Sequence, residues 1–285
     1  MKTAVVTDTN SGIFPEEAQR LGVFVLSMPV LIDGKTYYEG EDLSCQQFYQ
    51  FLKNGSSVFT SQPGPGFILP LWDRVLEEYD ELVYIPMSSG LSASCQTAQG
   101  LAQEYGGRVQ VADNHRISLS QKSAVLDAKA LADAGCGAAE IREELERTAF
   151  DSMIYVGVET LDYLKRSGRI TAAGAALGTI LGLRPLLKIE GEKLDACARV
   201  RGTDHCKIRL FSEIEKSIDR FLEKGWTIDV AAADSCPDPV DSGEWRAMAS
   251  EALGREHIGY SPLTCSIGSH TGPNAFGMAV SRRLA

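Results

Sequence analysis

Short apolar runs alternate with longer segments of helical periodicity over the first half of the chain. Strands are predicted at Thr3–Val6, Val23–Ile32 (which Pro29 interrupts), Leu82–Ile85 and Val109–Ala112. Helices are predicted from Pro15 to the glycine at 22, and over Phe67–Glu78, Ser92–Tyr105, Lys122–Asp133 and Ala138–Ala149. This alternation predicts an α/β domain with a parallel, Rossmann-like sheet covered by helices on both faces.

The order of elements changes after residue 151. The pattern there predicts a strand (Met153–Val158), a small-residue helix (Ala172–Gly182), a hairpin (Leu186–Ile189 and Ala196–Val200), a long helix (Lys207–Glu223), a strand (Ile228–Ala233), a helix (Glu244–Leu253) and strands near His257–Tyr260 and Leu263–Ile267. A hairpin with flanking helices predicts an α+β domain with a mixed or antiparallel sheet. We therefore expect two domains, 1–155 and 156–285.

Charge and cysteine content narrow the function classes. The chain of 285 residues has 28 Lys and Arg against 38 Asp and Glu, a formal net charge of −10, which disfavours a DNA-associated regulator. It contains neither a run of about 20 apolar residues nor a signal-peptide pattern, so no stable membrane insertion is expected. Seven cysteines without a CxxC pair predict reduced thiols and no metal site. We expect a cytoplasmic protein.

Two loops rich in hydroxyl groups stand directly before predicted helices. They are Thr60-Ser61-Gln62-Pro63-Gly64-Pro65-Gly66 and Ser88-Ser89-Gly90-Leu91-Ser92. Each is explained by helix capping alone, but together they favour one anion site at the carboxyl ends of parallel strands. The chain has neither GxxxxGK[ST] nor GxGxxG, so no nucleotide motif accompanies them.

A histidine in a glycine-flanked turn offers a rival, catalytic interpretation. His270 lies in Gly268-Ser269-His270-Thr271-Gly272-Pro273, which we expect to be a turn at a strand end. Ser89 or Ser92 with His270 as base would make a serine-dependent acyl hydrolase or transferase. The GxSxG nucleophile elbow of such enzymes is absent, however.

Cations and small residues cluster in the second half. Lys165, Arg166 and Arg169 surround Gly168, and Arg199 and Arg201 end the predicted hairpin. Guanidinium groups suit a phosphoryl group, although solvated surface charge is the simpler explanation from the residues alone. The helix at 172–182 allows close packing or leaves room for a slender apolar ligand.

These residues, in this order, resemble the DegV family, the fatty-acid-binding proteins that serve bacterial fatty acid kinase. The resemblance runs nearly end to end and rests on Val6-Thr7-Asp8, the two hydroxyl loops, Tyr163-Leu164-Lys165 with Gly168-Arg169-Ile170, Arg199-Val200-Arg201 and Ser269-His270-Thr271-Gly272-Pro273. It implies two α/β domains with a palmitate-like ligand in a buried tunnel between them.

The resemblance also implies roles for individual residues. Thr60, Ser92 and His270 would hold the carboxylate, with Ser61, Ser89 and Thr271 beside them. Arg169 and Arg201 would serve phosphotransfer or docking of the kinase. The chain would then be a carrier in phospholipid metabolism, with no cofactor, no metal and no catalytic residue of its own, and its partners would be the fatty acid and the kinase subunit.

The sequence departs from the family pattern at Asn10, Ala93-Ser94-Cys95, Asp113-Asn114-His115-Arg116 and Asn274. The first two departures are expected to touch the edge of the pocket. Burial of an acyl chain would supply the affinity, so the head needs only hydroxyl and amide donors. We expect the carboxylate to form no ion pair with an arginine, which would leave it nucleophilic.

Overall fold

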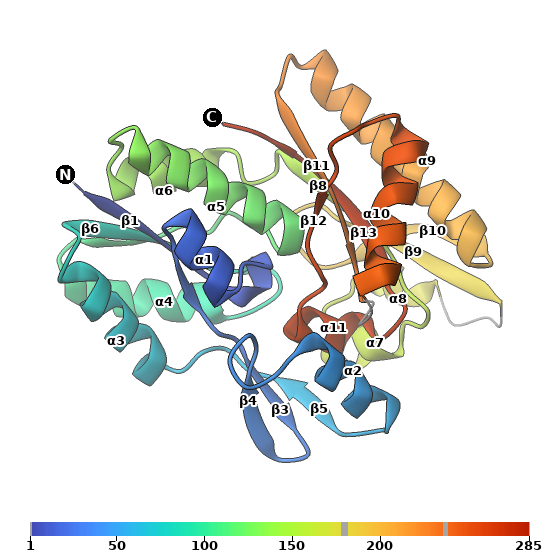
Figure 1. Ribbon diagram of the computed structural model, residues 1–285, viewed down its shortest axis with the longest axis horizontal. Helices are drawn as coiled ribbons and strands as arrows, with labels where there is room; N and C mark the ends of the chain where they lie inside the picture. The colour runs from blue at the N-terminus through green and yellow to red at the C-terminus, as the bar shows by residue number, and fades with distance from the viewer. Residues whose placement is uncertain (1, 178–181, 236–238, 285) are drawn as a thin grey trace.

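The computed structural model describes residues 2–177, 182–235 and 239–284, and it has the predicted α/β fold. Figure 1 shows one sheet with its helices on the left, a second sheet with its helices on the right and a small third sheet below them. The strands form groups of four, six and three.

The four-stranded sheet is parallel throughout, as predicted. Its order is β2-β1-β6-β7, with β1 Thr3–Asp8, β2 Phe24–Leu26, β6 Glu81–Ile85 and β7 Val109–Val111. Val5 and Val83 face the helices α1 (Pro15–Leu21), α5 (Ser118–Asp133) and α6 (Ala138–Arg147), whereas Val6 and Tyr84 face α3 (Pro65–Leu76) and α4 (Ser94–Ala102). Successive strand residues point to opposite faces, so both faces are buried.

The six-stranded sheet is mixed. Its order is β10-β9-β8-β13-β11-β12, with β8 Ser152–Gly157, β9 Leu183–Ile189, β10 Asp195–Arg201, β11 Ile228–Asp234, β12 Gly259–Tyr260 and β13 Phe276–Arg282. The predicted hairpin is the antiparallel pair β9–β10, and β12 alone pairs in parallel, with β11. The expected domain boundary at 155 falls inside β8, and the division into two domains remains a prediction.

The two faces of this sheet bury different partners. Tyr155 and Leu186 pack against α9 (Thr203–Glu223) and α10 (Pro239–Leu253). Ile154 and Leu187, from the same strands, point the other way and share a cluster with Met87 and other residues of the first half. The second sheet is therefore covered on one side by its own helices and on the other by the N-terminal half.

A third, antiparallel sheet was not found from the sequence. Its order is β4-β3-β5, with β3 Pro29–Ile32, β4 Lys35–Tyr38 and β5 Val58–Thr60. Short elements complete the chain: α2 Cys45–Lys53, α7 Asp162–Ser167, α8 Ala172–Ala176, α11 Cys265–Thr271 and the 3-10 turns η1 Thr9–Ser11 and η2 Gln103–Tyr105. Contacts join α11 to β3, β5 and α7.

Several predicted elements were wrong in type or extent. The expected strand 23–32 is two strands in different sheets, because the chain leaves the parallel sheet after Leu26 and re-pairs from Pro29. The expected strand Leu263–Ile267 is instead the start of α11, where the Thr264 side chain caps the helix by accepting from the Ile267 N–H. A short apolar run does not distinguish a strand from a buried helical turn.

The ends of two predicted helices also differ from those in the structure. The helix expected at 92–105 begins at Ser94 and ends in η2. The small-residue helix ends at Ala176, and residues 178–181 of the predicted element lie outside the described residues. In the described part of the chain, no helix is both long and apolar enough to cross a membrane, no cluster of potential metal ligands occurs, and the six described cysteines are free.

Candidate functional site

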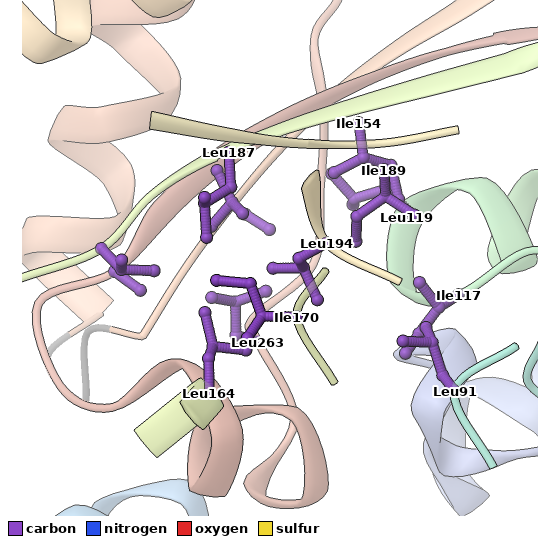
Figure 2. Packing of buried hydrophobic residues seen from close by; sticks show 14 of the residues in the cluster. Leu91, Ile117, Leu119, Ile154, Leu164, Ile170, Leu187, Ile189, Leu194 and Leu263 are labelled. Atoms are coloured by element: carbon purple, nitrogen blue, oxygen red, sulfur yellow. The ribbon is translucent and has the colours of Figure 1, made fainter. Parts of the chain in front are cut away.

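A cavity lies where the second sheet faces the N-terminal half. Its empty space, part of which is open to solvent, amounts to about 900 Å³. Its wall is mostly apolar, and Figure 2 shows Ile154 and Ile189 of the sheet above, Leu164 and Leu263 on one side, and Leu91 and Leu119 on the other. All six side chains belong to the cluster of buried residues that the second sheet shares with the N-terminal half, so the cavity borders the core between the two halves.

Polar groups gather at one part of this wall. Thr60 ends β5, whereas His270 lies in the last turn of α11, 210 residues later in the chain. Thr60 Oγ1 and His270 Nε2 share a hydrogen bond of 3.0 Å. The Ser61, Ser92 and Thr271 side chains line the same cavity, and Thr271 Oγ1 donates to the Ile267 carbonyl at 3.3 Å. Both hydroxyl loops and the histidine segment thus meet at one site.

The serines of the second hydroxyl loop have different surroundings. Ser92 lines the cavity and its Oγ lies 2.7 Å from Ser94 Oγ. Ser88 is fully buried and donates to the Gly191 carbonyl at 2.8 Å. Ser89 is not among the residues that line the described cavities, and its backbone N–H donates to Asp113. The structure thus places Ser92, but not Ser89, at the site.

The two expected arginines are separated. Arg169 lines the cavity beside His270, and its guanidinium donates to the carbonyls of Leu91 (3.3 Å) and Ser167. Arg169 thus lines the cavity, and our expectation that the carboxylate is left unpaired by arginine stays a prediction. Arg201 is exposed at the end of β10 and lines none of the described cavities.

The histidine is neutral at physiological pH. Burial, and secondarily the charge of Arg169, lowers the pKa of His270 from 6.5 to about 4. Among the described residues, its ring makes a hydrogen bond to Thr60, and neither a serine nor a carboxylate forms a hydrogen bond or ion pair with it. A Ser-His-acid arrangement requires those partners, and the described residues do not form one around His270.

The Val6-Thr7-Asp8 motif contributes a buried carboxylate whose hydrogen bonds hold together the loops next to the site. Asp8, fully buried at the end of β1, accepts hydrogen bonds from Asn10 N (3.0 Å), Met87 N (3.0 Å) and Gln121 Nε2 (3.2 Å). Burial raises the pKa of Asp8 to about 6. The hydrogen bonds of Asp8 hold the carboxyl end of β1 next to that of β6, which the second hydroxyl loop follows.

Some lining residues were missed or undervalued in the sequence. Asn10 lines the cavity and its Nδ2 lies 3.1 Å from Met87 Sδ, so this departure from the family pattern touches the pocket, whereas the departure at Ala93-Ser94-Cys95 does not line it. Ser118 also lines it, with a φ of 55°, and Ser266 comes from α11. A positive φ at a non-glycine residue is uncommon and concentrates at functional sites. The pattern of apolar and polar residues gives no signal for that conformation.

Comparison with known proteins places the chain in a family. The model of the DegV protein family matches residues 2–283, nearly the whole sequence. The chain belongs to the DegV family. A DegV domain-containing protein of Deinococcus radiodurans is 33% identical over 281 residues, covering 98% of each chain.

Solved DegV structures share this fold. A Thermus thermophilus DegV family protein, described by its fatty acid binding, has a TM-score of 0.86 at 32% identity and covers 99% of this chain and 100% of its own. Bacillus subtilis DegV, described as a fatty acid binding protein, has a TM-score of 0.83 at 25% identity with the same coverage. A stearic-acid-binding protein of Eubacterium ventriosum, at 19% identity and TM-score 0.88, shows the same fold (99% and 98% coverage).

Proposed function

We propose that this chain binds a long-chain fatty acid, such as palmitate, in the cavity between its two halves. The observation that carries the proposal is an apolar cavity with hydroxyl groups and a neutral imidazole at one part of its wall. The fatty acid binding of the Thermus and Bacillus relatives supports it. The acyl chain would contact the apolar wall, and the carboxylate would lie at Thr60, Ser92 and His270.

The acyl chain of the ligand, rather than its carboxylate head, would provide the binding affinity. Burial of about 15 methylene groups at about 0.8 kcal/mol each gives on the order of 12 kcal/mol before entropy costs. Hydrogen bonds from Thr60, Ser61 and Ser92 then need only replace the water lost by the carboxylate. These neutral donors would fix the orientation of the head.

Arg169 would bind the carboxylate head less strongly than an arginine whose guanidinium makes no other hydrogen bonds. Two of its nitrogens already donate to backbone carbonyls, so it is held in place and only part of its fork is left for a ligand. A bidentate pair would stabilise the ground-state carboxylate and reduce its nucleophilicity. We infer that Arg169 leaves the direct contacts with the carboxylate to Thr60, Ser92 and His270.

The bound acid would be presented to a separate ATP-dependent fatty acid kinase. A carboxylate oxygen would attack the γ-phosphorus of ATP held by the kinase, forming an acyl–O–P bond as ADP leaves. The chain has no nucleotide motif, so ATP binding is assigned to the partner. The protein would act as a cytoplasmic carrier in bacterial phospholipid metabolism, with no catalytic residue of its own.

Native mass spectrometry of the full chain tests the proposal. We expect an adduct of fatty-acid mass after purification, or after addition of palmitate to delipidated protein. Absence of an adduct in both experiments contradicts fatty acid binding. A fluorophosphonate probe tests the hydrolase alternative, since stable labelling of Ser89 or Ser92 would favour catalysis.

A further inference from the structure

Two polar side chains line the cavity away from the helix that carries the histidine. Asn10 lies in the turn η1, and Ser118 is the first residue of α5, which packs against that turn. Figure 2 shows Ile117 and Leu119, the chain neighbours of Ser118, well apart from Leu164 of α7, the helix that contacts α11. A ligand with its carboxylate at α11 would therefore meet Asn10 and Ser118 farther along its acyl chain.

Both side chains are buried and leave hydrogen-bonding capacity unused. Asn10 is fully buried and Ser118 is 7% exposed. The Asn10 amide nitrogen lies 3.1 Å from the Met87 sulfur, which can only accept, so the amide oxygen points elsewhere. Among the described residues, that oxygen has no hydrogen-bond partner, and neither has the Ser118 hydroxyl. Since buried polar groups are nearly always paired in folded proteins, the two groups point to a ligand that bonds them.

Nearby hydroxyl groups outside the cavity are bonded within the protein. Ser11 Oγ and Ser120 Oγ each donate to a backbone carbonyl, at 2.8 and 2.9 Å, and Ser123 Oγ donates to a carboxylate at 3.3 Å. None of these three serines lines the cavity, whereas Ser118 does. Ser118 also has a φ of 55°, and such backbone conformations concentrate at functional sites. The unused hydroxyl thus coincides with the cavity wall.

A hydroxyl group on the ligand matches this pair better than other substituents. The Asn10 amide oxygen can only accept, whereas the Ser118 hydroxyl can donate, so an alcohol bonds both at once. A ketone could only accept and would leave Asn10 unpaired, and a methylene group or a double bond would leave both unpaired. The wall around them contains Met28, Met87 and Ile117, so the alcohol would belong to an apolar chain.

We propose that this chain selects fatty acids that carry a hydroxyl group along the acyl chain, with Asn10 and Ser118 as the residues that bind it. The proposal rests on the proposed fatty acid binding, with the carboxylate at Thr60 and His270, and names the ligand class within it. A site built to bond a ligand hydroxyl rejects the analogue without it, because its own polar groups are then left unpaired. Palmitate would therefore bind more weakly than its hydroxylated counterpart.

Palmitates with one hydroxyl at different positions test this. Palmitate, α-hydroxypalmitate, ω-hydroxypalmitate and a palmitate with a mid-chain hydroxyl each displace a fluorescent fatty acid from the full-length wild type. We expect wild type to prefer the mid-chain or the ω isomer over palmitate about tenfold or more. The α isomer, whose hydroxyl lies beside the carboxylate, should show no such preference.

Three variants assign the preference to residues. Asn10→Leu removes the amide with little change in size, and Ser118→Gly removes the hydroxyl at a φ of 55° that glycine tolerates. Each should lose most of the preference, while palmitate affinity stays within about threefold of wild type or improves, which also shows that the variant is folded. Ser123→Ala, which alters a buried serine of the same helix outside the cavity, is the matched control and should keep the preference.

Failure of this inference differs from failure of the proposed function. If wild type binds neither palmitate nor any hydroxypalmitate, the proposed function fails. If palmitate binds but neither the mid-chain nor the ω isomer is preferred, or a folded Asn10→Leu or Ser118→Gly keeps the preference, the hydroxyl site is wrong. If one variant does not fold, the other decides alone. A preference for the α isomer only, abolished by Asn10→Leu, would assign Asn10 to the carboxylate and overturn the proposal.

Discussion

The Ser88 hydroxyl donates a hydrogen bond of 2.8 Å to the carbonyl of Gly191, 103 residues later in the chain. The same oxygen accepts from the Gly90 N–H at 3.1 Å. Ser88 is fully buried, and Gly191 lies in the turn between β9 and β10. This contact therefore joins the second hydroxyl loop of the N-terminal half to the hairpin of the second sheet.

Ser88→Ala should destabilise the protein. It leaves the Gly191 carbonyl and the Gly90 N–H without these partners, at a cost of about 1–3 kcal/mol in the free energy of unfolding. Urea unfolding measures this loss. Ser89→Ala is the matched control, because Ser89 is half-buried and its side chain makes no hydrogen bond to a described residue, so a change within about 0.5 kcal/mol is expected. Equal losses in the two variants would contradict this assignment.

Ser92→Ala should weaken fatty acid binding without unfolding the chain. One hydrogen bond contributes about 0.5–1.5 kcal/mol, which corresponds to roughly a 2- to 12-fold rise in the dissociation constant for palmitate. Displacement titration measures the affinity, and circular dichroism monitors the fold. Ser61→Ala, at the exposed edge of the cavity, provides a comparison. An unchanged affinity of Ser92→Ala would remove Ser92 from the head site.

His270 should remain neutral down to acidic pH. Its pKa is lowered to about 4 by burial and, secondarily, by Arg169, so the imidazole NMR shifts of the ligand-free protein should stay constant between pH 8 and about 5.5. Arg169→Gln removes the nearby positive charge and should raise the pKa of His270. Protonation of His270 near pH 6.5 in wild type would disprove the buried environment described for it.

Glu39→Gln should stabilise the protein at alkaline pH. Glu39 is buried, accepts from the Cys265 N–H at the start of α11, and has its pKa raised from 4.5 to about 7 by desolvation. The folded state therefore keeps its proton to higher pH than the unfolded chain, so the contribution of Glu39 to stability falls between pH 4.5 and 7.

Above pH 7 this cost is complete, on the order of 3 kcal/mol, and it disappears at acidic pH. Urea midpoints at pH 5 and pH 8 should therefore separate wild type from Glu39→Gln mainly at pH 8. Glu41→Gln, which removes an exposed carboxylate two residues away, should show no such pH-dependent gain. A Glu39→Gln variant that is less stable than wild type at pH 8 would contradict this.

Arg201→Ala should leave lipid binding intact and impair phosphorylation by the kinase. Arg201 is exposed and lines none of the described cavities, so removal of its charge should not change palmitate affinity. Displacement titration and an acyl phosphate assay with the partner kinase measure the two properties. Arg199→Ala, two residues earlier on β10, is the matched control. Loss of palmitate binding in Arg201→Ala would show that our division of roles is wrong.

The short-range pattern was sufficient for the parallel sheet. β1 and β6 are brief runs of β-branched and apolar residues followed by polar turns, and these features depend only on neighbours in the chain. The segment 34–57 and α11 were missed or assigned wrongly. α2 does carry a local signal, because Ser44 and Gln47 form a capping box at its start. The apolar residues of α11, such as Cys265, are instead buried by contacts with distant segments.

The candidate site shows the same division between features that the local sequence predicts and features that contacts between distant segments decide. The sequence alone determined the fold class, the net negative charge and the hydroxyl and histidine segments, because each follows from residue type and local order. Only the tertiary structure decided that Thr60 meets His270, that Ser88 rather than Ser89 is buried, and that Arg169 lies at the cavity while Arg201 does not. These relationships depend on how the two sheets and their loops pack against each other, and packing between residues hundreds of positions apart is not encoded in any single segment.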